Sequence, residues 1–279
     1  NRKKFTKDFP YNSIKFCLNK DKLKISDFDA ISLGWNPSAN MLKYNQEFSE
    51  TRTLRENNFY SMSDNLFNLT NRDPGNFTSI KHGNTKNMPE IFHVQHHLCH
   101  ASNSFFLSNF EEAAILTVDF KGEQQCTVWS YGKGNKIKVL DYQNIPDSLG
   151  LIYATFTSLL GYKPDSDEWK VMAMSAYDVD CKKYVQKIKS TYKLVNNGKL
   201  KLNHNFYGYF NRENKLLYTN KLLKLLNINS VIYKKSPSEK DIIIAKALQI
   251  CAEDIATHFL NHLFKLTKCK NLVLGGGFF

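Results

Sequence analysis

The chain has 279 residues, 42% of them hydrophobic, so it is long enough and apolar enough to bury a large core. Its formal net charge is +12, but almost all of the positive charge is lysine, and arginine occurs only at positions 2, 52, 55, 72 and 212. Because base readout and bidentate phosphate binding favour arginine, we do not expect a nucleic-acid partner.

No apolar run is long enough to span a bilayer, and the basic N-terminus is not followed by the apolar segment of a signal peptide. The six cysteines are scattered along the chain and include no CxxC pair, which is typical of reduced thiols. We therefore expect a cytoplasmic protein with no membrane partner.

The first part of the chain contains a few clear elements separated by a long polar stretch. Apolar residues at helical spacing predict a helix over 12–24, and the apolar run at 30–34 predicts a strand. Residues 40–90 are polar and are interrupted by a DPG turn signal, so we expect loops and short helices there. The segment 91–108 predicts a helix through its centre, and 113–120 predicts a buried strand.

The second part alternates strands, helices and turns in a pattern typical of α/β proteins. The predicted elements are a hairpin of strands at 126–131 and 136–142, an apolar helix at 148–160 with Ser148 as its N-cap, a long amphipathic helix at 241–267, and a strand with a glycine turn at 271–277. Residues 180–235 are rich in lysine and asparagine, and we expect them to lie at the periphery.

The densest group of chemistry-bearing residues is the histidine cluster His93, His96, His97 and His100. Side chains four positions apart share one face of a helix, so this spacing predicts two imidazoles directed at one metal ion. The pair is either His96 with His100 or His93 with His97, and spacing alone does not choose between them. The alternative is a histidine-rich helix that only forms hydrogen bonds in a polar cleft. Cys99 lies between the candidate ligands and is expected to be a packed thiol.

A carboxylate supplies the third candidate ligand. Asp119 ends an apolar strand, and the carboxyl end of a strand is where α/β sheets place ligands, although an aspartate there can also be a simple turn former. Two histidines and one carboxylate with open positions suit Fe(II), and they also suit Zn or Mn.

Two further groups carry weaker signals. The triple glycine Gly275, Gly276 and Gly277 follows a strand, so the backbone there can approach a phosphate or acyl group closely, or simply form a tight turn. Glu168 and Lys170 are either a catalytic pair or a surface ion pair.

Several sequence blocks resemble one family when they are taken together. HHLCHAS, VDFKGE, SLGLIYATFTSLLGY, DEWKVMAMSAYD and NLVLGGGFF occur in the order and approximate spacing of the NodU/CmcH carbamoyltransferases, and the N-terminal NRKKFTKDFP is similar to a basic segment of that family. The resemblance runs from residue 1 to residue 279. It implies an α/β fold of the actin/Hsp70-like (ASKHA) type, which is a pair of RNase-H-like subdomains with mixed sheets flanked by helices.

The same resemblance implies a domain organisation. We expect the first RNase-H-like subdomain over 1–112 and the second over 113–279, each truncated, with a YrdC-like domain downstream in the same chain. Because the sequence stops abruptly at LVLGGGFF, we expect it to be a fragment that is inactive by itself.

The resemblance also implies a reaction and a metal centre. The reaction moves a carbamoyl group from carbamoyl phosphate, through a carbamoyl-adenylate made with ATP, to a hydroxyl or amine of a small-molecule acceptor in a biosynthetic pathway. The metal, Fe(II) or another divalent ion, would be held by His96, His100 and Asp119. A further aspartate ligand is expected beyond Phe279.

The remaining site residues follow from the same resemblance. Lys4, on a basic position of the N-terminal segment, would neutralise the departing AMP phosphate, and His97 would orient the intermediate or assist proton transfer. Gly276 and Gly277 would hold the nucleotide, together with Lys170.

The chain departs from the family pattern at five positions, namely Phe120 and Trp169, which replace glycines, and Ala173, Ser175 and Asp178. These departures indicate an unusual acceptor pocket. The alternative functions are a tRNA threonylcarbamoyl-type transferase and a non-catalytic metal- or nucleotide-binding protein on the same fold.

Overall fold

The computed structural model describes residues 9–35, 89–209, 216–229 and 236–279. The chain forms two compact units, Asn1–His96 and His97–Phe279. The boundary predicted between residues 112 and 113 concerns RNase-H-like subdomains, and it stays a prediction.

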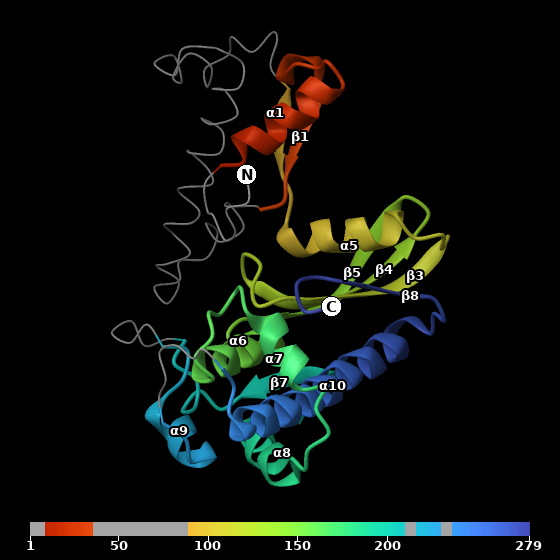
Figure 1. Cartoon of the computed structure of the whole chain (residues 1–279). Helices are drawn as coiled ribbons and strands as arrows, with labels where there is room; N and C mark the ends of the chain where they lie inside the picture. Colours follow the sequence, from red (N-terminus) through yellow and green to blue (C-terminus); the bar gives the residue numbers. More distant parts are fainter. Residues whose placement is uncertain (1–8, 36–88, 210–215, 230–235) are drawn as a thin grey trace. The chain divides into compact units, whose positions relative to one another are not determined.

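The described part of the first unit contains a helix and two paired strands (Figure 1). Helix α1 spans Tyr11–Lys20, and a short 3-10 helix, η1, spans Ile25–Asp27. Strands β1 (Ala30–Leu33) and β2 (Glu90–His93) pair in parallel. The helix and strand predicted near the N-terminus are therefore confirmed, with the helix slightly shorter than its apolar pattern.

The second unit is organised around a mixed sheet (Figure 1). Its strands are β3 (Glu112–Val118), β4 (Gln125–Lys133), β5 (Lys136–Asn144) and β8 (Leu272–Gly275). Their order is β5-β4-β3-β8, in which β3 pairs antiparallel with β4 and parallel with β8. The predicted hairpin and the mixed sheet flanked by helices are both confirmed.

Both faces of the sheet are covered, because successive side chains of a strand point to opposite faces. From β3, Ala113 and Ile115 pack against Ala101 and Phe105 of helix α5 (His96–Phe106). The alternate residues Ala114, Leu116 and Val118 join a larger core with helices α6 (Leu149–Leu159) and α10 (Glu239–Thr267). This two-sided burial explains why the strand is apolar without interruption rather than alternating.

The remaining elements lie between α6 and α10 in the chain. They are α7 (Glu168–Met174), α8 (Lys182–Lys189), β6 (Tyr192–Val195), β7 (Lys199–Leu202) and α9 (Asn220–Leu226). The expectation that 180–235 is peripheral is wrong for its described residues, since Ile188, Leu200, Leu222 and Leu226 are almost completely buried in the large core. Lysines and asparagines occupy the exposed positions around these apolar residues. The overall composition of the segment therefore does not reveal its buried apolar positions.

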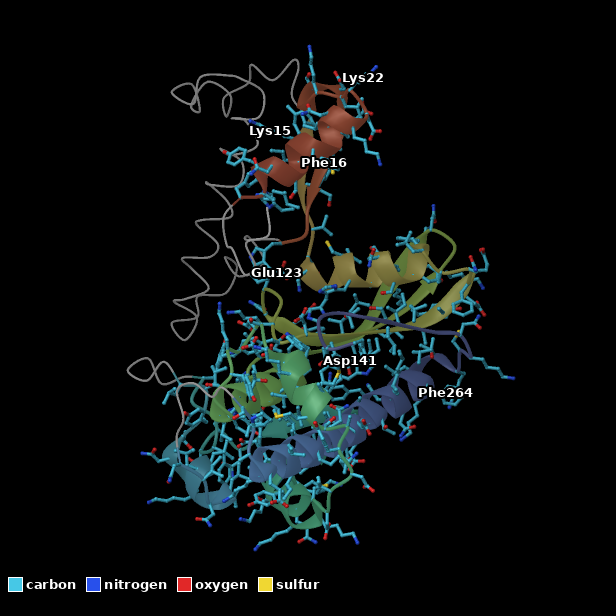
Figure 2. The ribbon with its side chains drawn as sticks, viewed as in Figure 1. Lys15, Phe16, Lys22, Glu123, Asp141 and Phe264 are labelled. Atoms are coloured by element: carbon cyan, nitrogen blue, oxygen red, sulfur yellow. The ribbon has the colours of Figure 1, made fainter. Side chains whose placement is uncertain are left out.

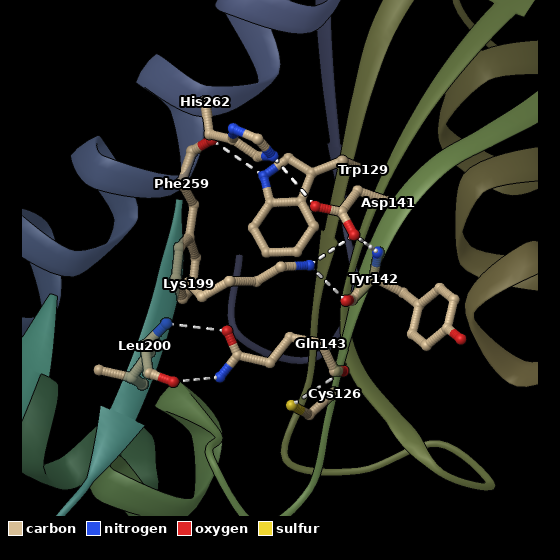
Figure 3. A network of polar contacts seen from close by, with 9 residues as sticks. All are labelled: Cys126, Trp129, Asp141, Tyr142, Gln143, Lys199, Leu200, Phe259 and His262. Carbon is tan, nitrogen blue, oxygen red and sulfur yellow. Dashed lines mark hydrogen bonds and ion pairs between the residues drawn. The ribbon is translucent and has the colours of Figure 1, made fainter. Parts of the chain in front are cut away.

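Polar side chains fasten the β6–β7 hairpin to the sheet and to α10 (Figure 3). Asp141 of β5 accepts hydrogen bonds from Lys199 Nζ at 2.5 Å and from His262 Nε2 at 3.1 Å. Gln143 extends the contact, because its amide bonds both the N–H and the C=O of Leu200, at 2.9 and 2.7 Å. The side-chain amide of Gln143 therefore bonds Leu200 in the way that the backbone of a neighbouring strand would, and this holds the hairpin on the sheet.

Trp129 supplies the apolar centre of the same region. Its indole N–H donates to the carbonyl of Phe259 at 2.9 Å, so a fully buried tryptophan keeps a hydrogen-bond partner. Within the described ranges, no helix combines the length and the apolarity that a bilayer crossing requires.

Candidate metal centre

Three of the predicted ligands lie together where α5 begins and β3 ends. His96 is the first residue of α5, and His100 follows one turn later on the same face. Asp119 comes directly after the last residue of β3. One ligand atom from each of these side chains lies within 4.8 Å of the others. The fold thus brings together the two imidazoles and the carboxylate that ligand chemistry calls for.

The carboxylate of Asp119 is held by several bonds. Its Oδ2 lies 3.0 Å from His100 Nε2, and its Oδ1 accepts the backbone N–H of Phe120 at 2.7 Å. The backbone N–H of Asp119 donates to the carbonyl of Cys126 at 2.9 Å, which extends the β3–β4 pairing by one residue. Both ligands remain partly accessible, with His100 exposed to 29% and Asp119 to 19%.

Secondary structure removes one of the two histidine pairs that spacing allowed. His93 is the last residue of β2, and the helix begins only at His96. His93 and His97 therefore do not share a helix face. The ring of His93 instead contacts the carbonyl of Trp35 at 3.1 Å.

The ring of His97 points into the sheet and is only 2% exposed. Its Nε2 lies 3.0 Å from the carbonyl of Gln125, and its Nδ1 lies 2.8 Å from the hydroxyl of Thr117. A carbonyl only accepts, so Nε2 carries the proton and Nδ1 accepts from the hydroxyl in the neutral ring. These contacts tie α5 to β3 and β4, and they favour a positioning role for His97 over proton transfer.

The glycine turn after β8 packs against the same carboxylate. Gly276 has a φ of +101°, and a Cβ on it would lie 2.2 Å from the carbonyl oxygen of Val118. A Cβ on Gly277 would lie 3.2 Å from Asp119 Oδ1. Close packing thus explains these glycines beside the candidate metal centre, and their contact with a nucleotide stays a prediction.

The other predicted site residues lie elsewhere. Lys170 of α7 forms an ion pair with Asp167 at 3.0 Å, whereas the carboxylate of Glu168 accepts the N–H groups of Asp165 and Ser166. Glu168 and Lys170 thus use different partners in this structure. Lys4 lies outside the described residues.

Two residues near the site escaped the sequence argument. Glu123, in the loop after β3 (Figure 2), is a carboxylate exposed to only 5%. Burial, followed by the charge of Glu123, raises the pKa of the nearby Cys99 thiol, which is partly exposed. Ser148 was expected only as a helix cap, yet its hydroxyl also reaches the carbonyl of Phe120 at 2.8 Å. In the sequence, the only signal for these two residues is that each belongs to a family-like block, Glu123 to VDFKGE and Ser148 to SLGLIY.

Comparison with known proteins places the chain in a family. The family described as Carbamoyltransferase N-terminus matches residues 1–279. The nodulation protein NolNO of Sinorhizobium fredii is 28% identical over 278 residues, which are 99% of this chain and 37% of that protein. The nodulation protein NolO of Bradyrhizobium diazoefficiens is 27% identical over 184 residues, 66% of this chain and 31% of that protein.

An uncharacterized protein of Synechocystis sp. is 28% identical over 284 residues, covering 99% of this chain and 45% of that protein. The chain therefore spans less than half the length of these relatives. The match over the whole chain also confirms the resemblance identified from the sequence blocks. The chain belongs to the carbamoyltransferase N-terminus family.

Proposed function

We propose that this chain holds the metal centre of a carbamoyltransferase that acts on a small-molecule acceptor. The observation that carries the proposal is the convergence of His96, His100 and Asp119, whose ligand atoms lie within 4.8 Å of one another. Membership of the carbamoyltransferase N-terminus family supports the reaction class.

The donor set fits a divalent metal ion. Two imidazoles and one carboxylate leave coordination positions open, a combination that suits Fe(II) and also Zn or Mn. The 3.0 Å contact between His100 Nε2 and Asp119 Oδ2 aims both donors at one small region. An ion bound there supplies Lewis-acid polarisation of a carbamoyl or phosphate oxygen.

The transfer itself needs a donor, an acceptor and a leaving group. In the proposed step the acceptor oxygen or nitrogen forms a bond to the carbamoyl carbon of a carbamoyl-adenylate. The bond from that carbon to the phosphate oxygen breaks, AMP leaves with the electron pair, and the acceptor proton passes to a base or to solvent. The contacts of the Asp119 carboxylate with His100 and with the Phe120 N–H hold this negatively charged group in a fixed orientation during the transfer.

The other predicted residues take supporting roles in this proposal. Lys4 neutralises the AMP phosphate, and Lys170 assists nucleotide binding. The backbone at Gly276 and Gly277 offers a surface without side chains next to Asp119, where a phosphate group can approach closely.

The arrangement of the second unit supports the ASKHA-type fold. Three antiparallel strands in sequence, a fourth strand parallel to the first, and helices on both faces are compatible with an RNase-H-like subdomain. We further propose that a YrdC-like domain in the longer protein makes the carbamoyl-adenylate from carbamoyl phosphate and ATP.

The test uses the full-length protein and measures metal content and reaction products separately. His96→Ala and His100→Ala should each lose the bound metal, measured by elemental analysis after dialysis, because each removes one donor. His258→Ala, on α10, where the ring contacts the carbonyl of Val195, and His93→Ala, on β2, are matched controls that should keep it. Equal metal content in all four variants would contradict the ligand assignment.

The reaction is followed as AMP and pyrophosphate released from ATP in the presence of carbamoyl phosphate. The metal-loaded protein should release both, and a candidate acceptor should increase turnover. A metal-loaded full-length protein that forms no AMP would contradict the transferase proposal while leaving the metal centre intact.

A further inference from the structure

The first turn of α6 lies against the peptide that carries the Asp119 ligand. Ser148, the N-cap of α6, is fully buried. Its hydroxyl lies 2.8 Å from the carbonyl oxygen of Phe120 and 3.1 Å from that of Asp119, and it accepts the N–H of Leu151 at 3.1 Å. The hydroxyl thus caps the helix and donates its single proton to the carbonyl of Phe120, the nearer acceptor, with the carbonyl of Asp119 close beside it.

Gly150 brings the same turn closer than any other residue type allows. A Cβ on Gly150 would lie 2.5 Å from the amide nitrogen and the Cα of Phe120, and 2.7 Å from the carbonyl carbon of Asp119. These neighbours are backbone atoms, so no flexible side chain can move aside. Real Cβ atoms do not approach other heavy atoms this closely, because interiors are packed at van der Waals contact.

The atom that Gly150 approaches is also the one that orients the carboxylate. The amide N–H of Phe120 donates to Asp119 Oδ1 at 2.7 Å, which leaves Oδ2 facing His100. Oδ2 also accepts the backbone N–H of Gly277 at 3.4 Å. We expect a shift of the Phe120 amide to rotate the carboxylate and to turn Oδ2 away from the imidazole. The backbone at 119–120 is fixed from the other side as well, because Asp119 N–H donates to Cys126.

We propose that Ser148 and Gly150 are positioning residues for the metal ligand Asp119. The inference rests on the proposed metal centre and deepens it. It gives the SLG segment at the start of α6 a physical task, namely to clamp the Asp119–Phe120 peptide so that the carboxylate faces His100. Neither residue touches the ion or the substrate.

The test measures the affinity and the spectrum of Co(II) bound to the full-length protein. Co(II) is the probe because its visible absorption reports the geometry of its ligands. Gly150→Ala should weaken Co(II) binding at least tenfold and change the absorption bands. Ser148→Ala should act in the same direction, whereas Ser148→Thr, which keeps the hydroxyl, should restore both affinity and spectrum. Gly198→Ala is the matched control, because its Cβ would crowd His262 on α10, far from Asp119 in the chain.

A second measurement does not depend on the metal. Hydrogen exchange of the peptide that contains the Phe120 amide should be faster in Ser148→Ala and Gly150→Ala than in the unsubstituted protein or in Gly198→Ala. If Gly150→Ala does not fold, Ser148→Ala and Ser148→Thr decide the question.

The outcomes separate the two proposals. If His100→Ala loses Co(II) but Ser148→Ala and a folded Gly150→Ala bind it like the unsubstituted protein, the positioning role is refuted and the metal centre stands. If the unsubstituted protein binds no Co(II), the metal centre fails, and unchanged hydrogen exchange in both variants would then refute the clamp independently.

Discussion

The buried ring of His97 offers the most direct test of how α5 is held on the sheet. Replacing it by leucine keeps a side chain of similar volume, so the change removes hydrogen bonds without opening a large cavity. The substitution leaves the Thr117 hydroxyl and the Gln125 carbonyl without the ring contacts seen at 2.8 and 3.0 Å.

The expected loss of stability follows from these two contacts. A buried polar group that loses its partner costs about 1–3 kcal/mol. The Thr117 hydroxyl loses the ring, whereas the Gln125 carbonyl keeps the N–H of Gly122 at 2.6 Å, so we expect His97→Leu to lower the free energy of unfolding by about 2 kcal/mol. Because Thr117 and Gln125 flank the segment that carries Asp119, metal affinity should fall as well.

The assay combines urea unfolding with metal binding in the full-length protein. His97→Gln is the informative partner, because its amide can donate to one contact and accept from the other. It should recover part of the stability and most of the metal affinity. His204→Leu is the control, because the His204 side chain is 37% exposed. This substitution should change the free energy of unfolding by less than about 0.5 kcal/mol.

The result that would refute this reasoning is a His97→Leu protein that unfolds like the unsubstituted one. If it also binds metal normally but forms no carbamoylated product, and His97→Gln is equally inactive, then the ring acts chemically and the proton-transfer role is correct.

Four further predictions concern other parts of the structure. Gln143→Leu should lower the free energy of unfolding by about 2 kcal/mol in urea titrations, because it strands the N–H and C=O of Leu200; a change under about 0.5 kcal/mol would contradict the bonding described for the β6–β7 hairpin. Burial raises the pKa of the Cys126 thiol to about 12 from 9.0, so the native protein should resist thiol reagents there while the exposed Cys17 reacts, as mass spectrometry of labelled peptides would report. Because the unfolded thiol loses its proton first, Cys126 makes stability fall as pH rises above about 9, and Cys126→Ala should flatten that slope in unfolding measured against pH. Divalent-ion affinity should fall as pH is lowered, since a protonated imidazole has no lone pair to donate, and a pH-independent Co(II) affinity would argue against histidine ligands.

Much of the fold was readable from local patterns. The apolar run of β3 predicted a strand because it is buried on both faces, and the turn between β4 and β5 predicted the hairpin. The serine before the apolar run at 149–159 predicted the start of α6 correctly. These features depend on residues that are neighbours in the sequence, so they can be predicted from the sequence without the tertiary structure.

The candidate site divides in the same way. Sequence identified His96, His100 and Asp119 as donors, but helical spacing offered a second histidine pair, and only the resemblance to a family chose between them. In the structure, β2 ends at His93 and α5 begins at His96, so His93 and His97 do not share a helix face; the assignment of His96 and His100 as metal ligands stays a prediction.

Other features were decided by tertiary structure alone. Nothing in the local sequence indicates that the side chain of His97 is buried. Nor does it indicate that His100, three residues later on the same helix, stays accessible beside Asp119. Nor does the sequence reveal that Gly150 must be glycine, since the atoms it avoids belong to Phe120, thirty residues earlier. Composition and spacing determined which groups are available for chemistry, and the packing of α5, α6 and the glycine turn around the end of β3 determined which of them meet. The physical reason is that periodicity fixes a side chain's direction within one element, whereas its distance to groups on other elements exists only once the elements are packed.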